Sequence, residues 1–168
     1  MGIARLIMKS KLIAFIWGVL FWLALNNSID TPVLIVGGVV SAVIALLFVK
    51  GDLFKDCSLS PKAFVAAISW FLIFSVELIK SNIDVALRVI SPKVRINPAI
   101  VECKTKLKSK MGRMALANSI TLTPGTLTTD IIDDKLYIHW IDATSTDVDG
   151  ATKKIVEKFE KPLEVIFG

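Results

Sequence analysis

The sequence predicts a membrane α-helical part with three N-terminal transmembrane helices, followed by a small C-terminal α+β domain. Hydrophobic residues make up 54% of the 168 residues, which exceeds the roughly 45–50% of a typical soluble protein. The excess lies in three long apolar runs before residue 80, and the remaining segment has the composition of a soluble domain. We therefore expect a membrane domain over residues 1–92 and a small α+β domain over residues 97–168.

The three apolar runs are Leu12–Leu25, Pro32–Val49 and Ala63–Ile79. A transmembrane helix needs about 20 mostly apolar residues, and we place the spans at about 8–26, 32–50 and 61–82. The first run has the basic start of a signal peptide, but no small-x-small cleavage pattern follows it, so we expect it to be retained. The linker at residues 26–30 is short and predicts a helical hairpin, in which Gly37 and Gly38 permit close packing.

The third predicted helix has clear limits. Ser60 is suited to cap its start, and Pro61 to occupy its first position. No helix breaker follows until Ser91-Pro92, so we expect the helix to continue to about residue 90. Thirty residues give about 45 Å of helix, which exceeds the thickness of the hydrocarbon core. Its last turns should therefore project into water.

Four charged residues fall on one face of this helix, because they are three or four positions apart: Glu77, Lys80, Asp84 and Arg88. Their signs alternate, which is typical of a self-paired polar stripe at the membrane edge. Carboxylates inside a membrane are also functional candidates, and Glu77 lies deepest. These four residues are accordingly our candidates for an ion path or for a contact with a partner subunit.

Charge is unevenly distributed: residues 1–62 carry a net +3, residues 63–113 a net +6 and residues 114–168 a net −4. The basic residues flank predicted spans, which indicates attraction to a membrane surface rather than to nucleic acid. Basic loops tend to be cytoplasmic, and this tendency favours the cytoplasm for residues 5–11, 50–62 and 80–113 alike. Three crossings cannot satisfy all three segments. We expect three spans with a cytoplasmic C-terminal domain, and leave the N-terminal orientation open.

The polar half predicts the order β-α-β-β-α. The segment Ala99–Lys108 alternates, with Val101, Cys103, Thr105 and Leu107 on its buried face, and is a predicted strand. Residues 108–120 predict a helix, and Thr126–Ile132 and Leu136–Ile141 predict a hairpin across residues 133–135. A last helix is expected after a cap at Asp149, with Pro162 kinking or ending it.

The threonine-rich segment ALANSITLTPGTLTTDI (Ala115–Ile131) separates this helix from the hairpin. A phosphate-binding loop needs several glycines that open a helix, whereas this segment has one glycine and follows a helix. Ser119 as a nucleophile would need a base, and nothing in the sequence pairs it with His139, the one histidine. We therefore expect a helix exit, a Pro124-Gly125 turn and the start of a strand, and no catalysis.

The sequence also predicts neither a cofactor nor a metal site. Cys57 and Cys103 are 46 residues apart and fit no CxxC pattern, so we expect thiols rather than a disulfide or a zinc site. His139 lies in a predicted strand, where a packed or solvated histidine is the simplest interpretation. A pH-sensing role is open to any histidine, although no feature of the sequence requires one here.

The segments LANSITLTPGTLTTDI and LYIHWID, together with the order of spans, long third helix and small tail, resemble the E subunit of Mrp-type multisubunit Na⁺/H⁺ antiporters. The resemblance covers essentially the whole chain and includes the homologous subunit of membrane-bound hydrogenase-type complexes. It implies folding or docking roles for the motif residues, which are Asn118, Ser119, Thr121, Thr123, Pro124, Gly125, Thr126, Thr128, Asp130, His139 and Trp140.

The resemblance implies a non-catalytic accessory subunit of a multi-pass complex in the plasma membrane of a prokaryote. Its partners would be other membrane subunits and the lipid bilayer, and ion translocation would belong to the larger subunits. The alternative is a membrane-anchored domain that senses a ligand, for which a pocket within residues 97–168 would be the discriminating feature.

Overall fold

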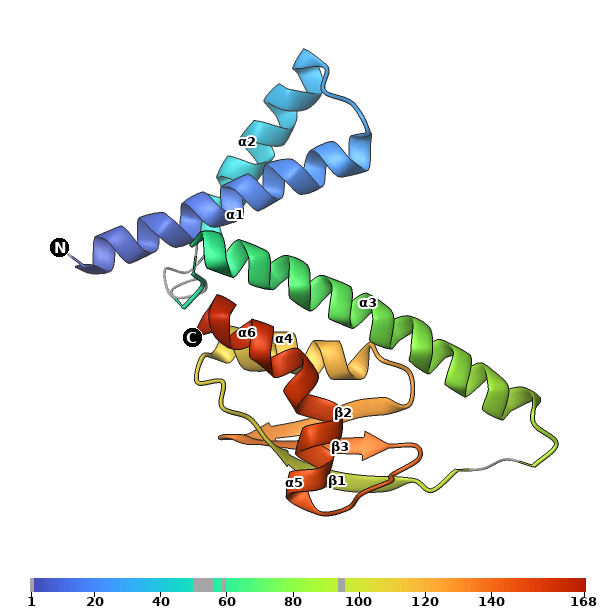
Figure 1. Ribbon diagram of the computed structural model, residues 1–168. Helices are drawn as coiled ribbons and strands as arrows, with labels where there is room; N and C mark the ends of the chain where they lie inside the picture. The colour runs from blue at the N-terminus through green and yellow to red at the C-terminus, as the bar shows by residue number, and fades with distance from the viewer. Residues whose placement is uncertain (1, 50–55, 59, 94–95) are drawn as a thin grey trace. The chain divides into compact units, whose positions relative to one another are not determined.

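The computed structural model describes residues 2–49, 56–58, 60–93 and 96–168 (Figure 1). The chain forms two compact units, Met1–Asp56 and Cys57–Gly168. Each unit is described by itself.

The first unit is a hairpin of α1 (Gly2–Asn26) and α2 (Thr31–Leu47), as the short linker predicts. α1 ends at Asn27, which takes the left-handed conformation (φ 47°) that closes many helices. The indole nitrogen of Trp22 donates a hydrogen bond to the carbonyl of Val33 (3.1 Å). Gly37 lies directly under this indole, because a Cβ there would come within 2.3 Å of it, whereas Gly38 faces open space. Of the two predicted packing glycines, only Gly37 makes the close approach.

Among the described residues, two helices are long and apolar enough to cross a membrane. They are the stretch Ile7–Asn26 of α1 and the whole of α3 (Pro61–Ile90). α2, with 17 residues, falls short of that length. Of the three expected transmembrane helices, α1 and α3 are thus long and apolar enough to cross, and α2 is too short by the same measure.

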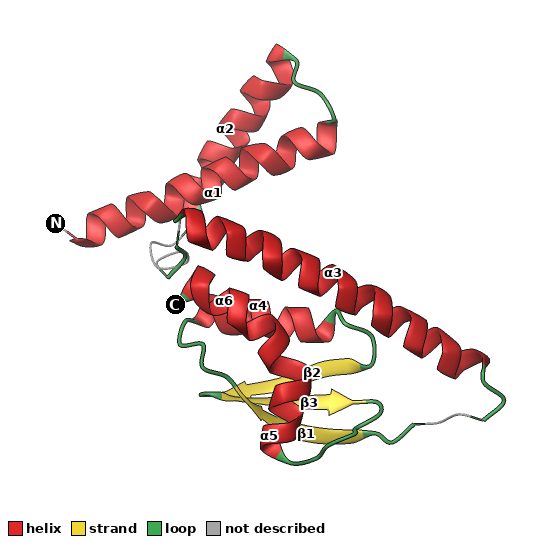
Figure 2. Cartoon of the chain, in the orientation of Figure 1, coloured by secondary structure: helices red, strands yellow, loops and turns green. Residues whose placement is uncertain are grey.

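The second unit contains α3 and the predicted α+β fold. The strands are β1 (Ala99–Lys104), β2 (Thr126–Ile132) and β3 (Lys135–Trp140), in the antiparallel order β1-β3-β2. Helix α4 (Lys110–Thr121) follows β1, and α5 (Val148–Ala151), a π-helical turn (Thr152–Val156) and α6 (Glu157–Phe167) form the C-terminal helix. Figure 2 shows α4 and α6 between α3 and the sheet. The predicted order β-α-β-β-α is therefore confirmed.

The core lies between the sheet and the two helices. The predicted inner face of β1 is buried, and its residues Val101 and Cys103 pack with Leu136 and Ile138 of β3. Leu116 and Ile120 of α4 and Phe159 and Leu163 of α6 complete it. The predicted strand to Lys108 ends early, at Lys104, because the next residues turn inward to bind Glu160. There the Thr105 hydroxyl and the Lys106 amide (2.8 Å) both donate to the buried Glu160 carboxylate.

Two predictions about the last helix need correction. Its cap is Asp147 rather than Asp149, because the Asp147 carboxylate accepts a hydrogen bond from the Gly150 amide (2.7 Å). Of the two predicted effects of Pro162, the ending of the helix is wrong, since α6 continues through the buried Pro162 to Phe167, and the kink stays a prediction.

Helix α3 has the predicted limits, with Ser60 accepting from the Ala63 amide (3.1 Å) and Pro61 in the first turn. One face of its first half packs on the core of the α+β fold through Ala66, Trp70 and Phe74. The Ser58 amide donates to the carbonyl of Ile166 (2.7 Å), which ties the start of α3 to the end of α6. The second compact unit thus begins before α3 and includes it. The predicted division near residue 92 separates the membrane domain from the α+β domain, and it stays a prediction.

Candidate functional site

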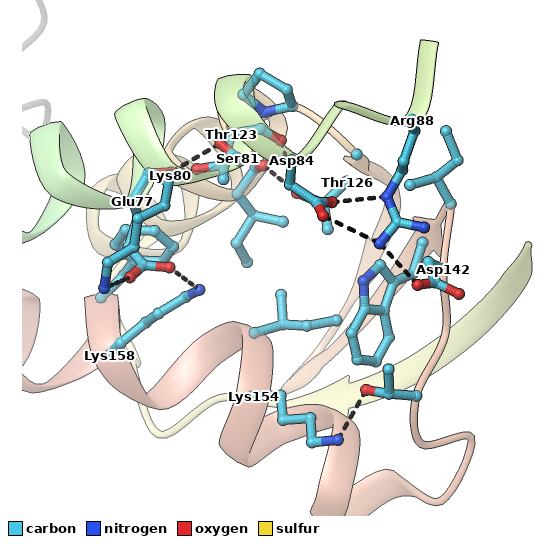
Figure 3. Close-up of a pocket in the computed structure, with 18 residues that line it drawn as sticks. Glu77, Lys80, Ser81, Asp84, Arg88, Thr123, Thr126, Asp142, Lys154 and Lys158 are labelled. Atoms are coloured by element: carbon cyan, nitrogen blue, oxygen red, sulfur yellow. Dashed lines mark hydrogen bonds and ion pairs between the residues drawn. The ribbon is translucent and has the colours of Figure 1, made fainter. Parts of the chain in front are cut away.

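The four charged residues of α3 face the α+β fold, where the structure brings them together with the threonine-rich motif (Figure 3). They line a cavity of about 310 Å³ between α3, the α4–β2 turn and the C-terminal helix. Motif residues that share this lining are Thr123, Pro124, Gly125, Thr126 and Trp140. Two groups of residues that were predicted separately therefore meet at one place.

At the first end of the cavity, Glu77 is the centre of a small ionic cluster. Its carboxylate pairs with Lys80 on the same helix (3.4 Å) and with Lys158 on α6. The Lys158 ammonium also lies 5.3 Å from the centre of the Phe159 ring. The predicted pairing along the stripe is present, and the link to Lys158 is an additional contact that joins α3 to α6.

At the other end, Arg88 is held by two carboxylates. Its guanidinium makes a two-pronged contact with Asp84 (2.8 and 3.2 Å) and reaches Asp142 after β3 (2.8 Å). Paired Arg–carboxylate forks combine directionality with charge neutralisation. The stripe is thus neutralised by its own members and by one partner at each end from the α+β fold.

The threonine-rich segment forms the predicted joint between α4 and β2. Gly125 has φ of 94°, a conformation that side chains other than glycine rarely adopt, and its carbonyl accepts from the Ile141 amide (2.9 Å). The hydroxyl of Thr126 donates to the carbonyls of Ile120 (2.6 Å) and Thr123 (2.9 Å). The hydroxyl of Thr123 donates to the carbonyl of Ser119 (2.8 Å). These hydroxyls add hydrogen bonds to carbonyls in the last turn of α4 and in the turn that follows it, where the regular helical bonds end.

Ser119 has a separate role. It is 1% exposed, donates to the carbonyl of Ala115 (2.7 Å) and accepts from the indole nitrogen of Trp70 on α3 (3.1 Å). Both of its hydrogen-bonding capacities are used inside the fold, which leaves no free hydroxyl for nucleophilic attack. The serine of the motif therefore fastens α4 to α3.

The remaining motif residues lie elsewhere. The Thr121 hydroxyl accepts from the Thr128 amide (3.1 Å), and this pair lines an open groove with Asn118 and Asp130. His139 and Trp140 point to opposite faces of β3: His139 is exposed, and Trp140 packs against the core. Although they are adjacent in sequence, they do not form one site.

The charged residues of the site are engaged in ion pairs with one another and with the α+β fold. Within the described residues, no group of three His, Cys, Asp or Glu side chains is placed to hold a metal ion. Glu77 and Asp84 are engaged by cationic side chains, which compete with any bound cation. Sequence reasoning missed Asp142 and Lys158, because both lie far from α3 along the chain and only the tertiary fold brings them there.

Comparison with known proteins places the chain in a family. Residues 15–166 match the family model described as Na⁺/H⁺ ion antiporter subunit. The E subunit of the Na⁺/H⁺ antiporter of Alkalihalophilus pseudofirmus is 37% identical over 144 residues, which are 84% of this chain and 88% of that protein. The corresponding E subunit of Bacillus subtilis is 35% identical over 147 residues, 86% of this chain and 90% of that protein.

One solved structure is similar along almost its whole length. It is a chain of the membrane-bound sulfane sulfur reductase, an archaeal respiratory membrane complex, with a TM-score of 0.80 and 45% identity. The similarity covers 94% of this chain and 99% of that one. A match over residues 15–166 and two relatives above 30% identity lead to one conclusion: the chain belongs to the family of Na⁺/H⁺ antiporter E subunits.

Proposed function

We propose that the chain is a non-catalytic accessory subunit of a multisubunit cation/proton antiporter module. The module would be either a stand-alone antiporter or part of a respiratory complex. The observation that carries the proposal is the family match over residues 15–166, together with 45% identity to a chain of a respiratory membrane complex. The site supports it, since Ser119 and the charged residues of α3 are engaged in contacts that stabilise the fold.

We infer further that the protein is a multi-pass membrane protein, with α1 and α2 each crossing the bilayer. α2 spans about 25 Å at 1.5 Å per residue, which is close to the lower limit for a crossing. Two crossings return the chain to the side on which it started. Provided that α3 does not cross as well, the basic residues at positions 5–11, 50–62 and 80–113 then all lie on one side, which the positive-inside tendency identifies as the cytoplasm. The α+β fold would accordingly be cytoplasmic.

The sensing alternative gains no support from the cavity. Small-molecule sites are mostly apolar, with a few polar groups for orientation, whereas this cavity is lined by charged groups that already neutralise one another.

Two preparations of the tagged chain from its native membranes test the proposal. In the first the chain is purified together with its partners, and in the second the partners are dissociated from it. We expect the chain to co-purify with several larger membrane proteins, and the complex to catalyse Na⁺/H⁺ exchange in liposomes. The single chain in matched liposomes should give no exchange above empty vesicles. Exchange by the single chain would contradict the accessory role, and purification without membrane partners would contradict membership of a complex.

A further inference from the structure

Helix α3 exposes a mostly apolar face along its length, interrupted by Ser75 and Asn82. Its outer face, as we call it, includes Phe64, Ile68, Phe71, Ile79, Ile83 and Leu87, each 47–69% exposed. These residues recur every three to four positions, apart from the interval of eight between Phe71 and Ile79, and they fall on one side of the helix. Glu77, Asp84 and Arg88 lie on the opposite side and bind one another or the α+β fold. An apolar face of this length on 30 residues of helix needs a partner.

The α+β fold lies along the inner side of α3 from one end to the other. Ser58 just before α3 binds Ile166, and Trp70 binds Ser119. The contacts Glu77–Lys158 and Arg88–Asp142 continue the series to the last turn of α3. If α3 stood upright in a bilayer, every turn of it would therefore lie at about the same depth as some part of the α+β fold.

This arrangement conflicts with a crossing by α3. If α3 crossed the bilayer, the α+β fold would lie beside it at the depth of the hydrocarbon core. The strands β1 and β2 are both edges of the sheet, and β2 exposes Asp130 and is followed by exposed Asp133. Open sheet edges and exposed carboxylates are strongly disfavoured in hydrocarbon, where no water satisfies them.

We propose that α3 lies flat in the membrane interface, with its outer face in lipid and the α+β fold on the cytoplasmic surface. Helices of this kind combine a strongly apolar face with a charged one. Lys62 and Lys80 are 18 residues apart, about five turns, so both lie on the same edge of the outer face. The exposed ammonium of Lys62 can bind lipid phosphates while its stem covers apolar surface, and Lys80 keeps its pair with Glu77 at the same edge.

Lipid fits the outer face better than a protein partner. The segment 63–113 carries a net charge of +6, all of it after α3 in residues 91–113, and this basic part of the α+β fold complements the anionic cytoplasmic surface of a membrane. The arrangement also removes the conflict in the sequence, because two crossings put all three basic segments on one side. This inference rests on one part of the proposed function, which is the anchoring of the chain in the membrane by α1 and α2.

Single cysteines at the two ends of α3 give the first test. In a Cys57→Ser background, Lys62→Cys and Lys93→Cys are introduced separately into the full chain in native membranes, since both positions are exposed. A membrane-impermeant maleimide is applied to intact cells and to inside-out vesicles. We expect both sites to be labelled only in the vesicles, at least tenfold more than in cells. Labelling of the two sites from opposite sides would show that α3 crosses, and would overturn the inference.

The background without an added cysteine controls for Cys103, which is fully buried. Labelling of both sites only in intact cells would overturn the cytoplasmic placement. Co-purification with antiporter subunits is scored separately for each variant, so that a failure of the proposed function is distinguished from a failure of this inference.

The second test measures depth. Nitroxide labels at positions 64, 71, 79 and 87 are compared by their accessibility to oxygen and to a water-soluble nickel complex. A helix in the interface places all four within about 10 Å of depth, which is at most the diameter of a helix with its side chains. A crossing helix would separate positions 64 and 79 by about 22 Å. Depths that differ in this way would overturn the inference, and so would labels shielded from both reagents, since protein would then cover the outer face.

Discussion

At the scale of single residues, Ser119 connects two segments that lie 49 positions apart through its hydrogen bond with Trp70. The Trp70 indole nitrogen has this hydroxyl as its partner in a half-buried position. Removing one member of such a bond leaves the other unsatisfied, which costs more than the bond itself contributes.

We therefore expect Ser119→Ala to destabilise the α3–α4 contact by about 1–3 kcal/mol. Thermal unfolding of the purified complex, followed by scanning calorimetry, measures the loss. The matched control is Ser75→Ala, since the Ser75 hydroxyl binds the carbonyl of Phe71 in its own helix (2.8 Å). Equal effects of the two changes would contradict a special role of Ser119.

The two cysteines should differ in reactivity. Burial raises the pKa of the Cys103 thiol to about 11, and the thiolate is the reactive form. Iodoacetamide at pH 8 should therefore modify the half-buried Cys57 at least 100-fold faster, as measured by mass spectrometry. Because the pKa in the folded state is raised, the contribution of this thiol to stability is complete below about pH 9 and is lost as the pH rises through 11. Comparable rates at pH 8 would show that Cys103 is accessible.

At the scale of secondary-structure elements, Glu160 holds α6 to the segment between β1 and α4. Its carboxylate is 4% exposed and accepts hydrogen bonds from the Thr105 hydroxyl and the Lys106 amide. Buried charged acceptors with two donors contribute more than neutral ones. Glu160→Ala should lower the free energy of unfolding by about 1.5–3 kcal/mol, as measured by chemical denaturation. Glu164→Ala, one turn further along α6, is the control and should have less effect.

The α1–α2 hairpin depends on the missing side chain of Gly37. A methyl group there would overlap the Trp22 indole, whereas one at Gly38 would meet nothing within 4 Å. Gly37→Ala should therefore loosen the hairpin, at a cost of about 1–3 kcal/mol, and Gly38→Ala should leave it unchanged. Disulfide cross-linking of cysteines placed on the two helices reports the change. A larger effect at Gly38 would contradict the observed packing.

At the scale of the whole molecule, the ionic contacts between α3 and the α+β fold decide whether Glu77 is part of an ion path. If the Glu77–Lys158 pair only holds the fold, Glu77→Gln and Lys158→Gln should reduce Na⁺/H⁺ exchange by the complex equally, and by less than about threefold, because this partly exposed pair would act on the fold and not on the transported ion. If Glu77 transfers protons, Glu77→Gln should abolish exchange while Lys158→Gln does not. Exchange assays on the reconstituted complex, normalised to its assembly, separate these outcomes.

Local patterns in the sequence were enough for most of the fold. The alternation in β1, the cap at Ser60 and the Pro124-Gly125 turn depend on neighbouring residues only, and all three are confirmed. The cap at Asp147 was missed because two aspartates two positions apart are equally suitable by type, and only the backbone decides between them. Asp142, Lys158 and Glu160 were missed because their partners are 54 to 81 positions away, a distance at which one sequence gives no pairing signal.

The hydrogen bond between Ser58 and Ile166 makes the unit Cys57–Gly168 a closed ring, in which the first residues meet the last. Chains whose ends meet tolerate being opened elsewhere and rejoined. A circular permutant that begins in the exposed Asp133-Asp134 turn and links residue 168 to residue 57 would keep every contact described between α3 and the α+β fold. The unit can thus be treated as an exchangeable module, joined to the helical hairpin at a single point of the chain.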